Sequence, residues 1–89
     1  MRETVFKYPV QLGAFSMDMP AGARVLHVDM QGAEPVMWAR VNPSADIVRR
    51  RFYCAATGET LPRNAGGWIG TLKMQGGALI FHVFEMPAP

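Results

Sequence analysis

The chain has 89 residues, a formal net charge of +2 and a single cysteine, and 49% of its residues are hydrophobic while 18% are charged. This length predicts one domain over residues 1–89, and one cysteine excludes a disulfide framework. One cysteine and two histidines also fall short of the three or four closely spaced ligands of a zinc site, so we expect no metal and no cofactor.

The low charged fraction has a consequence for association. Globular domains carry about 25% charged residues, and a small core cannot hide all of the apolar surface of this chain. We therefore expect a homo-oligomer or a partner-binding face. No apolar run approaches the roughly 20 residues that span a bilayer, so we expect no membrane segment. A single free cysteine is typical of a reducing compartment, which predicts a cytoplasmic protein.

Apolar and polar residues alternate along most of the chain, and a period of two predicts an all-β fold. The first strand, residues 5–12, contains Pro9, which cannot donate to a β-ladder, so we expect it at a sheet edge. A short strand over 15–19 and a turn at Pro20–Ala23 follow. The next strand, 24–31, is predicted to point Leu26, Val28 and Met30 into the core.

The second half of the chain continues the pattern. Strands are predicted over 35–41, 47–55, 68–74 and 78–85, with a hairpin loop at 31–34, a long loop over 56–67 and a tight turn at Gly76–Gly77. The last strand is apolar on both faces, which predicts a central position. Seven short strands with close turns are typical of a small antiparallel barrel or of a sandwich.

The tripeptide Met-Gln-Gly occurs twice, at residues 30–32 and 74–76, each time at the end of a predicted strand and before another. This repeat predicts two similar hairpins stacked across one core, and chance is the alternative explanation for three matching residues.

The residue types of common active sites are present but not clustered. Cys54 shares its predicted face with Phe52 and is expected to be a small buried hydrophobic residue rather than a nucleophile. His82 is expected to be packed with its ring nitrogens hydrogen-bonded, and His27 to be solvated. The acidic residues are scattered, so no enzyme activity is expected.

The most conspicuous charged feature is the run Arg49-Arg50-Arg51. On a strand, Arg49 and Arg51 share a face with Tyr53, whereas Arg50 points to the other side. Guanidinium groups beside an aromatic ring bind phosphates or stack on bases, and a solvated strand face is the alternative. We expect Arg40 on a neighbouring strand, and the predicted binding residues are Arg49, Arg51, Tyr53, Arg40 and Trp38.

Several segments resemble short proteins of unknown function found in tailed bacteriophages and prophages. They are Phe6-Lys7-Tyr8, residues 19–28, Trp38-Ala39-Arg40-Val41, residues 67–72 and residues 76–85. The resemblance covers nearly the whole chain and implies a viral or prophage origin, with action in the host cell cytoplasm. It brings no assigned catalytic or binding residue.

These observations favour a phage accessory protein that counters a host defence by binding. Its partner would be a host protein, as for an anti-CRISPR-like inhibitor, or a small anionic ligand such as a nucleotide signal. One alternative is a nucleic-acid-binding small β-barrel, although two or three arginines suit a small anion better than a duplex. The other alternative is a minor structural or assembly protein of a phage.

Overall fold

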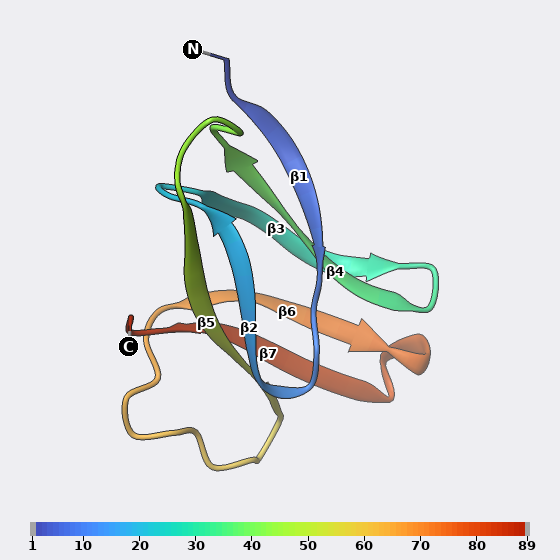
Figure 1. The fold of residues 1–89 in the computed structure, drawn as a ribbon. Helices are drawn as coiled ribbons and strands as arrows, with labels where there is room; N and C mark the ends of the chain where they lie inside the picture. The colour runs from blue at the N-terminus through green and yellow to red at the C-terminus, as the bar shows by residue number, and fades with distance from the viewer. Residues whose placement is uncertain (1, 89) are drawn as a thin grey trace.

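Seven strands form two antiparallel sheets in the computed structural model, which describes residues 2–88 (Figure 1). The strands are β1 (Thr4–Pro9), β2 (Gly13–Pro20), β3 (Arg24–Gln31), β4 (Glu34–Val41), β5 (Ile47–Ala56), β6 (Trp68–Met74) and β7 (Leu79–Met86), and the short 3-10 helix η1 (Gln75–Gly77) joins the last two. One sheet has the order β1-β4-β3 and the other β2-β5-β7-β6. The all-β prediction is confirmed, and of its two forms the sandwich fits: over the described residues the sheets do not close into one barrel.

Alternate side chains of the strands point between the sheets and make the core. Phe15 of β2 and Phe52 of β5 are direct register partners, and their rings stack with centroids 5.2 Å apart. The buried cluster is Val10, Phe15, Met19, Ala23, Val28, Met37, Ala39, Val41, Phe52, Cys54, Leu72 and Val83. The period of two therefore decides which residues are buried.

The positions of two strands agree with the sequence. β7 lies between β5 and β6, as its two apolar faces predict, and β1 lies at an edge, as Pro9 predicts. The prediction that the first strand runs to residue 12 is wrong, since β1 ends at Pro9. The Val10 N–H still donates to the Pro35 carbonyl at 3.0 Å, after which the chain crosses to the other sheet and β2 begins at Gly13, whose φ is 74°.

The predicted direction of Leu26 is also wrong. A β-bulge shifts the β3–β4 register between Val25 and His27, and this extra residue leaves the Leu26 side chain 50% exposed. Val25 packs against the core in its place, while Val28 is buried as predicted.

The two sheets meet where β3 packs against β6. At this contact a Cβ on Gly70 would lie 3.0 Å from the Val28 Cβ, so glycine permits the close approach. The β3–β4 and β6–β7 hairpins end side by side (Figure 1), and both line one hollow. Gly32 and Gly76 of the repeated tripeptide both adopt positive φ, 62° and 65°, so the repeat corresponds to two comparable turns.

Candidate functional site

The outward side of the four-stranded sheet, called the outer face below, carries the predicted arginine strand. β2 and β5 pair so that Ser16 lies opposite Arg51 and Asp18 opposite Arg49. Because the inward partners Phe15 and Phe52 are buried, these alternate pairs point to solvent. Tyr53 follows on the same face of β5, as the sequence predicts.

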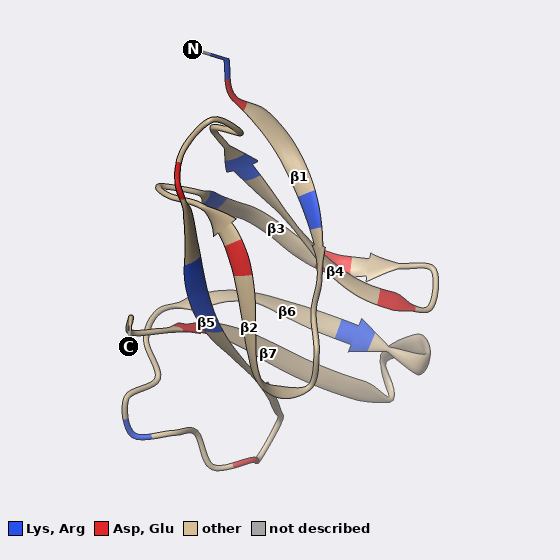
Figure 2. Ribbon diagram, viewed as in Figure 1, with Lys and Arg blue, Asp and Glu red and all other residues tan. Residues whose placement is uncertain are grey.

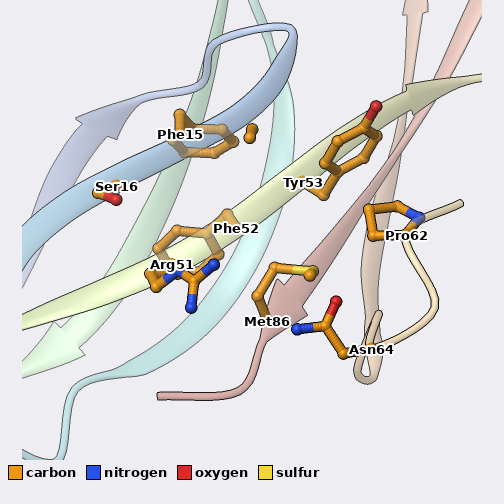
Figure 3. Close-up of a pocket in the computed structure, with 9 residues that line it drawn as sticks. Phe15, Ser16, Arg51, Phe52, Tyr53, Pro62, Asn64 and Met86 are labelled. Carbon is orange, nitrogen blue, oxygen red and sulfur yellow. The ribbon is translucent and has the colours of Figure 1, made fainter. Parts of the chain in front are cut away.

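A hollow of about 490 Å³ lies on this face under the loop between β5 and β6 (Figure 3). Its lining comprises Ala14, Phe15, Ser16, Arg51, Phe52, Tyr53, Pro62, Asn64 and Met86. The sheet supplies the guanidinium, the phenol ring and the serine hydroxyl, and the loop supplies a proline ring and an amide. Such a set of polar groups beside apolar walls is typical of a site for a small molecule.

The three consecutive arginines are in different electrostatic situations. Arg49 pairs with Asp18, with Nε 3.2 Å from Oδ1. Arg50 points inward, where its guanidinium pairs with Glu85. Arg51 forms no ion pair within the described residues, and it is the arginine that lines the hollow. Arg51 is therefore the member of the run that retains its donors for a ligand.

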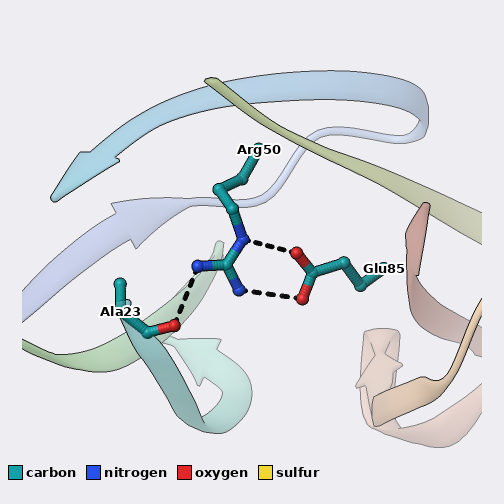
Figure 4. A network of polar contacts seen from close by, with 3 residues as sticks. All are labelled: Ala23, Arg50 and Glu85. Atoms are coloured by element: carbon teal, nitrogen blue, oxygen red, sulfur yellow. Dashed lines mark hydrogen bonds and ion pairs between the residues drawn. The ribbon is translucent and has the colours of Figure 1, made fainter. Parts of the chain in front are cut away.

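The Arg50–Glu85 pair lies within the four-stranded sheet, and a further bond from Arg50 reaches the turn before β3 (Figure 4). Arg50 Nε and Nη2 donate to the two Glu85 oxygens at 2.5 and 2.9 Å, and Nη1 donates to the Ala23 carbonyl at 2.8 Å. Arg50 and Glu85 belong to the four-stranded sheet, whereas Ala23 immediately precedes β3 of the other sheet. The hydrogen bond to Glu85 raises the pKa of Arg50, so this guanidinium stays protonated.

The loop above the hollow is anchored through Tyr53. The Tyr53 hydroxyl donates to Glu59 Oε2 at 2.5 Å, and the Ala56 N–H donates to Glu59 Oε1 at 3.1 Å. The hydrogen bond to the carboxylate raises the pKa of Tyr53. The same bond, with that from Ala56, lowers the pKa of Glu59.

The lowered pKa of Glu59 makes this anchor sensitive to acid. A carboxyl group whose pKa is lower in the folded state stabilises that state above its unfolded pKa, and the contribution is lost as the pH falls through the folded value. We expect hydrogen exchange at the Ala56 and Glu59 amides to accelerate as the pH falls through the lowered pKa of Glu59, after correction for the intrinsic exchange rates. In Glu59→Gln this additional acceleration should disappear; a wild-type pH profile identical to that of Glu59→Gln would contradict the prediction.

The structure does not bring all five predicted binding residues together. The expectation that Arg40 neighbours the arginine strand is wrong, because β4 belongs to the three-stranded sheet and does not pair with β5. Trp38 lies on that other sheet too, where its ring stacks on His27 with centroids 6.2 Å apart. Sequence proximity misleads here because the chain changes sheets between β4 and β5.

Of the residues that line the hollow, only Arg51 and Tyr53 were predicted as binding residues, and Ser16, Asn64 and Met86 are among those that the sequence did not reveal. Ser16 and Met86 are both direct register partners of Arg51, from the strands on either side of β5. No hairpin joins β2 or β7 to β5, so the sequence does not indicate these two pairings. Asn64 reaches the site because the end of its loop pairs with β7: the Gly66 N–H donates to the Glu85 carbonyl at 3.0 Å.

The two histidines are placed as predicted. His82 Nε2 lies 2.8 Å from Thr57 Oγ1, and its Nδ1 lies 3.1 Å from Thr71 Oγ1. The Trp68 indole N–H donates to the same Thr71 oxygen at 3.2 Å. His27 is exposed and lies 3.4 Å from an Asp29 oxygen. Within the described residues no three His, Cys, Asp or Glu side chains gather as metal ligands.

Cys54 is buried, as predicted, and burial raises the pKa of its thiol to about 11. The thiolate is the reactive form, so we expect Cys54 in the native protein to react with a disulfide reagent such as DTNB far more slowly than in denaturant. The rate of colour development in buffer and in guanidinium chloride measures this. Equal rates would show that the thiol is accessible and would contradict the burial.

Charge is distributed over both sheets rather than gathered in one basic patch (Figure 2). Arg40, Arg49 and Arg50 each contact a carboxylate, from Glu3, Asp18 and Glu85. Among residues 2–88 no helix is long and apolar enough to cross a membrane.

Fold and site together define a small antiparallel β-sandwich with a polar hollow on one outer face. The chain belongs to the family described as Domain of unknown function (DUF7352), whose model matches residues 1–89. Comparisons with curated proteins and with solved structures give no match.

Proposed function

We propose that this chain works by binding a small anionic molecule that carries a planar ring, such as a nucleotide, in the hollow on its outer face. The observation that carries the proposal is Arg51, a guanidinium without a carboxylate partner among the described residues, beside the Tyr53 ring in a hollow of about 490 Å³. Arginine offers paired donors to phosphate oxygens, and an aromatic ring stacks on a base.

Other lining residues support the same class of ligand. The Ser16 hydroxyl and the Asn64 amide supply further hydrogen-bonding groups, while Pro62 and Met86 supply apolar surface. The distributed charge argues against a long duplex, whose binding draws on many phosphate contacts. The hollow contains one arginine and a few neutral donors, which suits a ligand with one anionic group.

The biological setting we propose is that of a phage or prophage accessory protein in the host cytoplasm, which counters a host defence by sequestering a nucleotide signal. This part rests on the resemblance of the sequence to short proteins of tailed phages. The homo-oligomer expected from the composition belongs to the same proposal.

Native mass spectrometry of the protein, gently purified from bacterial cells, tests the proposal. We expect an oligomer or monomer that carries an added mass of a few hundred daltons, and loss of that mass in Arg51→Gln. Arg49→Gln is the matched control, since it removes the same charge from the same strand outside the hollow and should retain the added mass. A titration with ADP should shift the Ser16, Arg51 and Asn64 amide resonances.

The proposal fails if the wild-type protein carries no added mass and these amides do not respond to ADP. It also fails if Arg49→Gln and Arg51→Gln lose the ligand equally, because the effect would then follow net charge rather than the hollow.

One observation favours a single-stranded nucleic acid as a second candidate. Tyr53 and Trp68 are both direct register partners of Phe84, so three aromatic side chains form a row across the outer face. Rows of this kind bind successive bases by stacking. The Trp68 side chain is 62% exposed, so its fluorescence can report on a bound base. We expect oligothymidine at low salt to quench the tryptophan fluorescence of the wild type and of Trp38→Leu, but not that of Trp68→Leu. No quenching at low salt would exclude this second candidate.

A further inference from the structure

Two arginines lie directly opposite one another on the three-stranded sheet, away from the hollow described above. Arg24, at the start of β3, is the register partner of Arg40 on β4. Side chains in such positions have Cβ atoms about 4.5–5.5 Å apart, and like charges placed there repel. Both residues are exposed. An anion that accepts hydrogen bonds from both guanidinium groups would relieve this repulsion.

Glu3 meets this need only in part. Its Oε1 accepts from Arg40 Nε at 2.8 Å and lies 2.7 Å from Arg40 Nη2. Arg24 forms no ion pair within the described part of the chain. Two positive charges thus face a single carboxylate, which lies just before β1 and contacts only one of them as an ion pair.

Both arginines, Glu3 and Gly22 line a hollow of about 210 Å³. Gly22 has a φ of 81° in the turn before β3, so this wall has no side chain and leaves the backbone open to a ligand. The hollow is large enough for a tetrahedral oxyanion but not for a nucleoside as well. Two guanidinium groups on one side of such an ion can donate to two of its oxygens at once.

We propose that this hollow is a second binding site, specific for a terminal phosphoryl group, and that Glu3 is a built-in competitor for it. In the free protein Glu3 neutralises Arg40. When a phosphoryl group enters between Arg24 and Arg40, the carboxylate is displaced, because both anions need the same donors. Since the site is exposed, binding weakens as salt screens the charges. The site is independent of the proposed ligand in the outer-face hollow.

An NMR titration of the full chain with inorganic phosphate tests the proposal. We expect saturable shifts of the Gly22, Arg24 and Arg40 amides. Arg24→Gln and Arg40→Gln should each weaken binding by about tenfold or more, which is the effect of losing about 1.4 kcal/mol. Glu3→Gln should strengthen it. Arg49→Gln removes the same charge from the other sheet and should leave the phosphate affinity within about twofold of the wild type.

Two further ligands separate the possible sources of the phosphoryl group. AMP carries a terminal phosphoryl group, and hexathymidine without a 5′ phosphate carries only backbone diesters. AMP should compete with phosphate at Gly22, Arg24 and Arg40, and hexathymidine should not. Binding of hexathymidine without binding of phosphate would overturn the proposal, and so would equal losses in Arg24→Gln and Arg49→Gln. Shifts confined to Ser16, Arg51 and Asn64 would overturn this site and leave the outer-face hollow standing.

Discussion

Glu85→Gln is expected to lower the free energy of unfolding by about 1–3 kcal/mol. Breaking a fully buried ion pair costs about 3–5 kcal/mol, because one charge remains buried without its partner. The side chains of Arg50 and Glu85 are 21% and 33% exposed, so water relieves part of this cost. The Arg50 bond to the Ala23 carbonyl remains, but the counter-charge is gone. Urea denaturation followed by Trp fluorescence measures the change.

The matched control is Asp18→Asn, which removes the carboxylate partner of Arg49 on the same sheet. That pair is largely exposed, with side chains 66% and 59% accessible, and exposed pairs contribute about 0–1 kcal/mol. The double substitution Arg50→Met with Glu85→Leu should be less destabilising than Glu85→Gln, since it leaves no unpaired charge. Equal losses in Glu85→Gln and Asp18→Asn would show that the partly buried pair contributes no more than the exposed one.

Gly66→Ala is expected to destabilise the protein by about 1–3 kcal/mol, the usual cost of forcing extra atoms into a filled space. A Cβ at this position would overlap the Glu85 carbonyl oxygen, which is backbone and cannot rotate away. The Gly66 N–H donates to that same oxygen. The substitution therefore breaks the bond that brings the loop back to β7. For a domain of this size each kcal/mol lowers the Tm by about 4–8 °C, which calorimetry detects.

Gly67→Ala is the control for this change, because a Cβ there has no atom within 4 Å and its substitution should be nearly neutral. The Gly66→Ala effect should also be local. Hydrogen exchange should accelerate at Gly66 and Glu85 before it does at the core strands. In addition, Asn64 should no longer line the outer-face hollow in this variant. Equal melting temperatures for the two variants would contradict the close approach of the loop to β7.

The side-chain pattern alone determined the strands and much of their burial. Alternation separates Phe52, Cys54 and the inward Arg50 from Arg49, Arg51 and Tyr53 because successive residues of a strand face opposite sides. The edge position of β1 follows from the missing N–H of Pro9, and the central position of β7 from its two apolar faces. These are local properties, so a single sequence contains them.

Beyond the two predicted hairpins, only the tertiary structure decided which strands became neighbours, and with them the sites. Ser16 and Met86 lie beside Arg51 because β2 and β7 both pair with β5. Arg40 lies opposite Arg24 on the other sheet, away from the arginine strand. The bulge that exposes Leu26 likewise depends on how β3 meets β4. Strand order and register depend on contacts between residues distant in sequence, and alternation is satisfied equally well by several pairings. For this reason the sequence indicated an arginine–tyrosine strand, whereas the hollow around it and the second arginine pair emerged only from the fold.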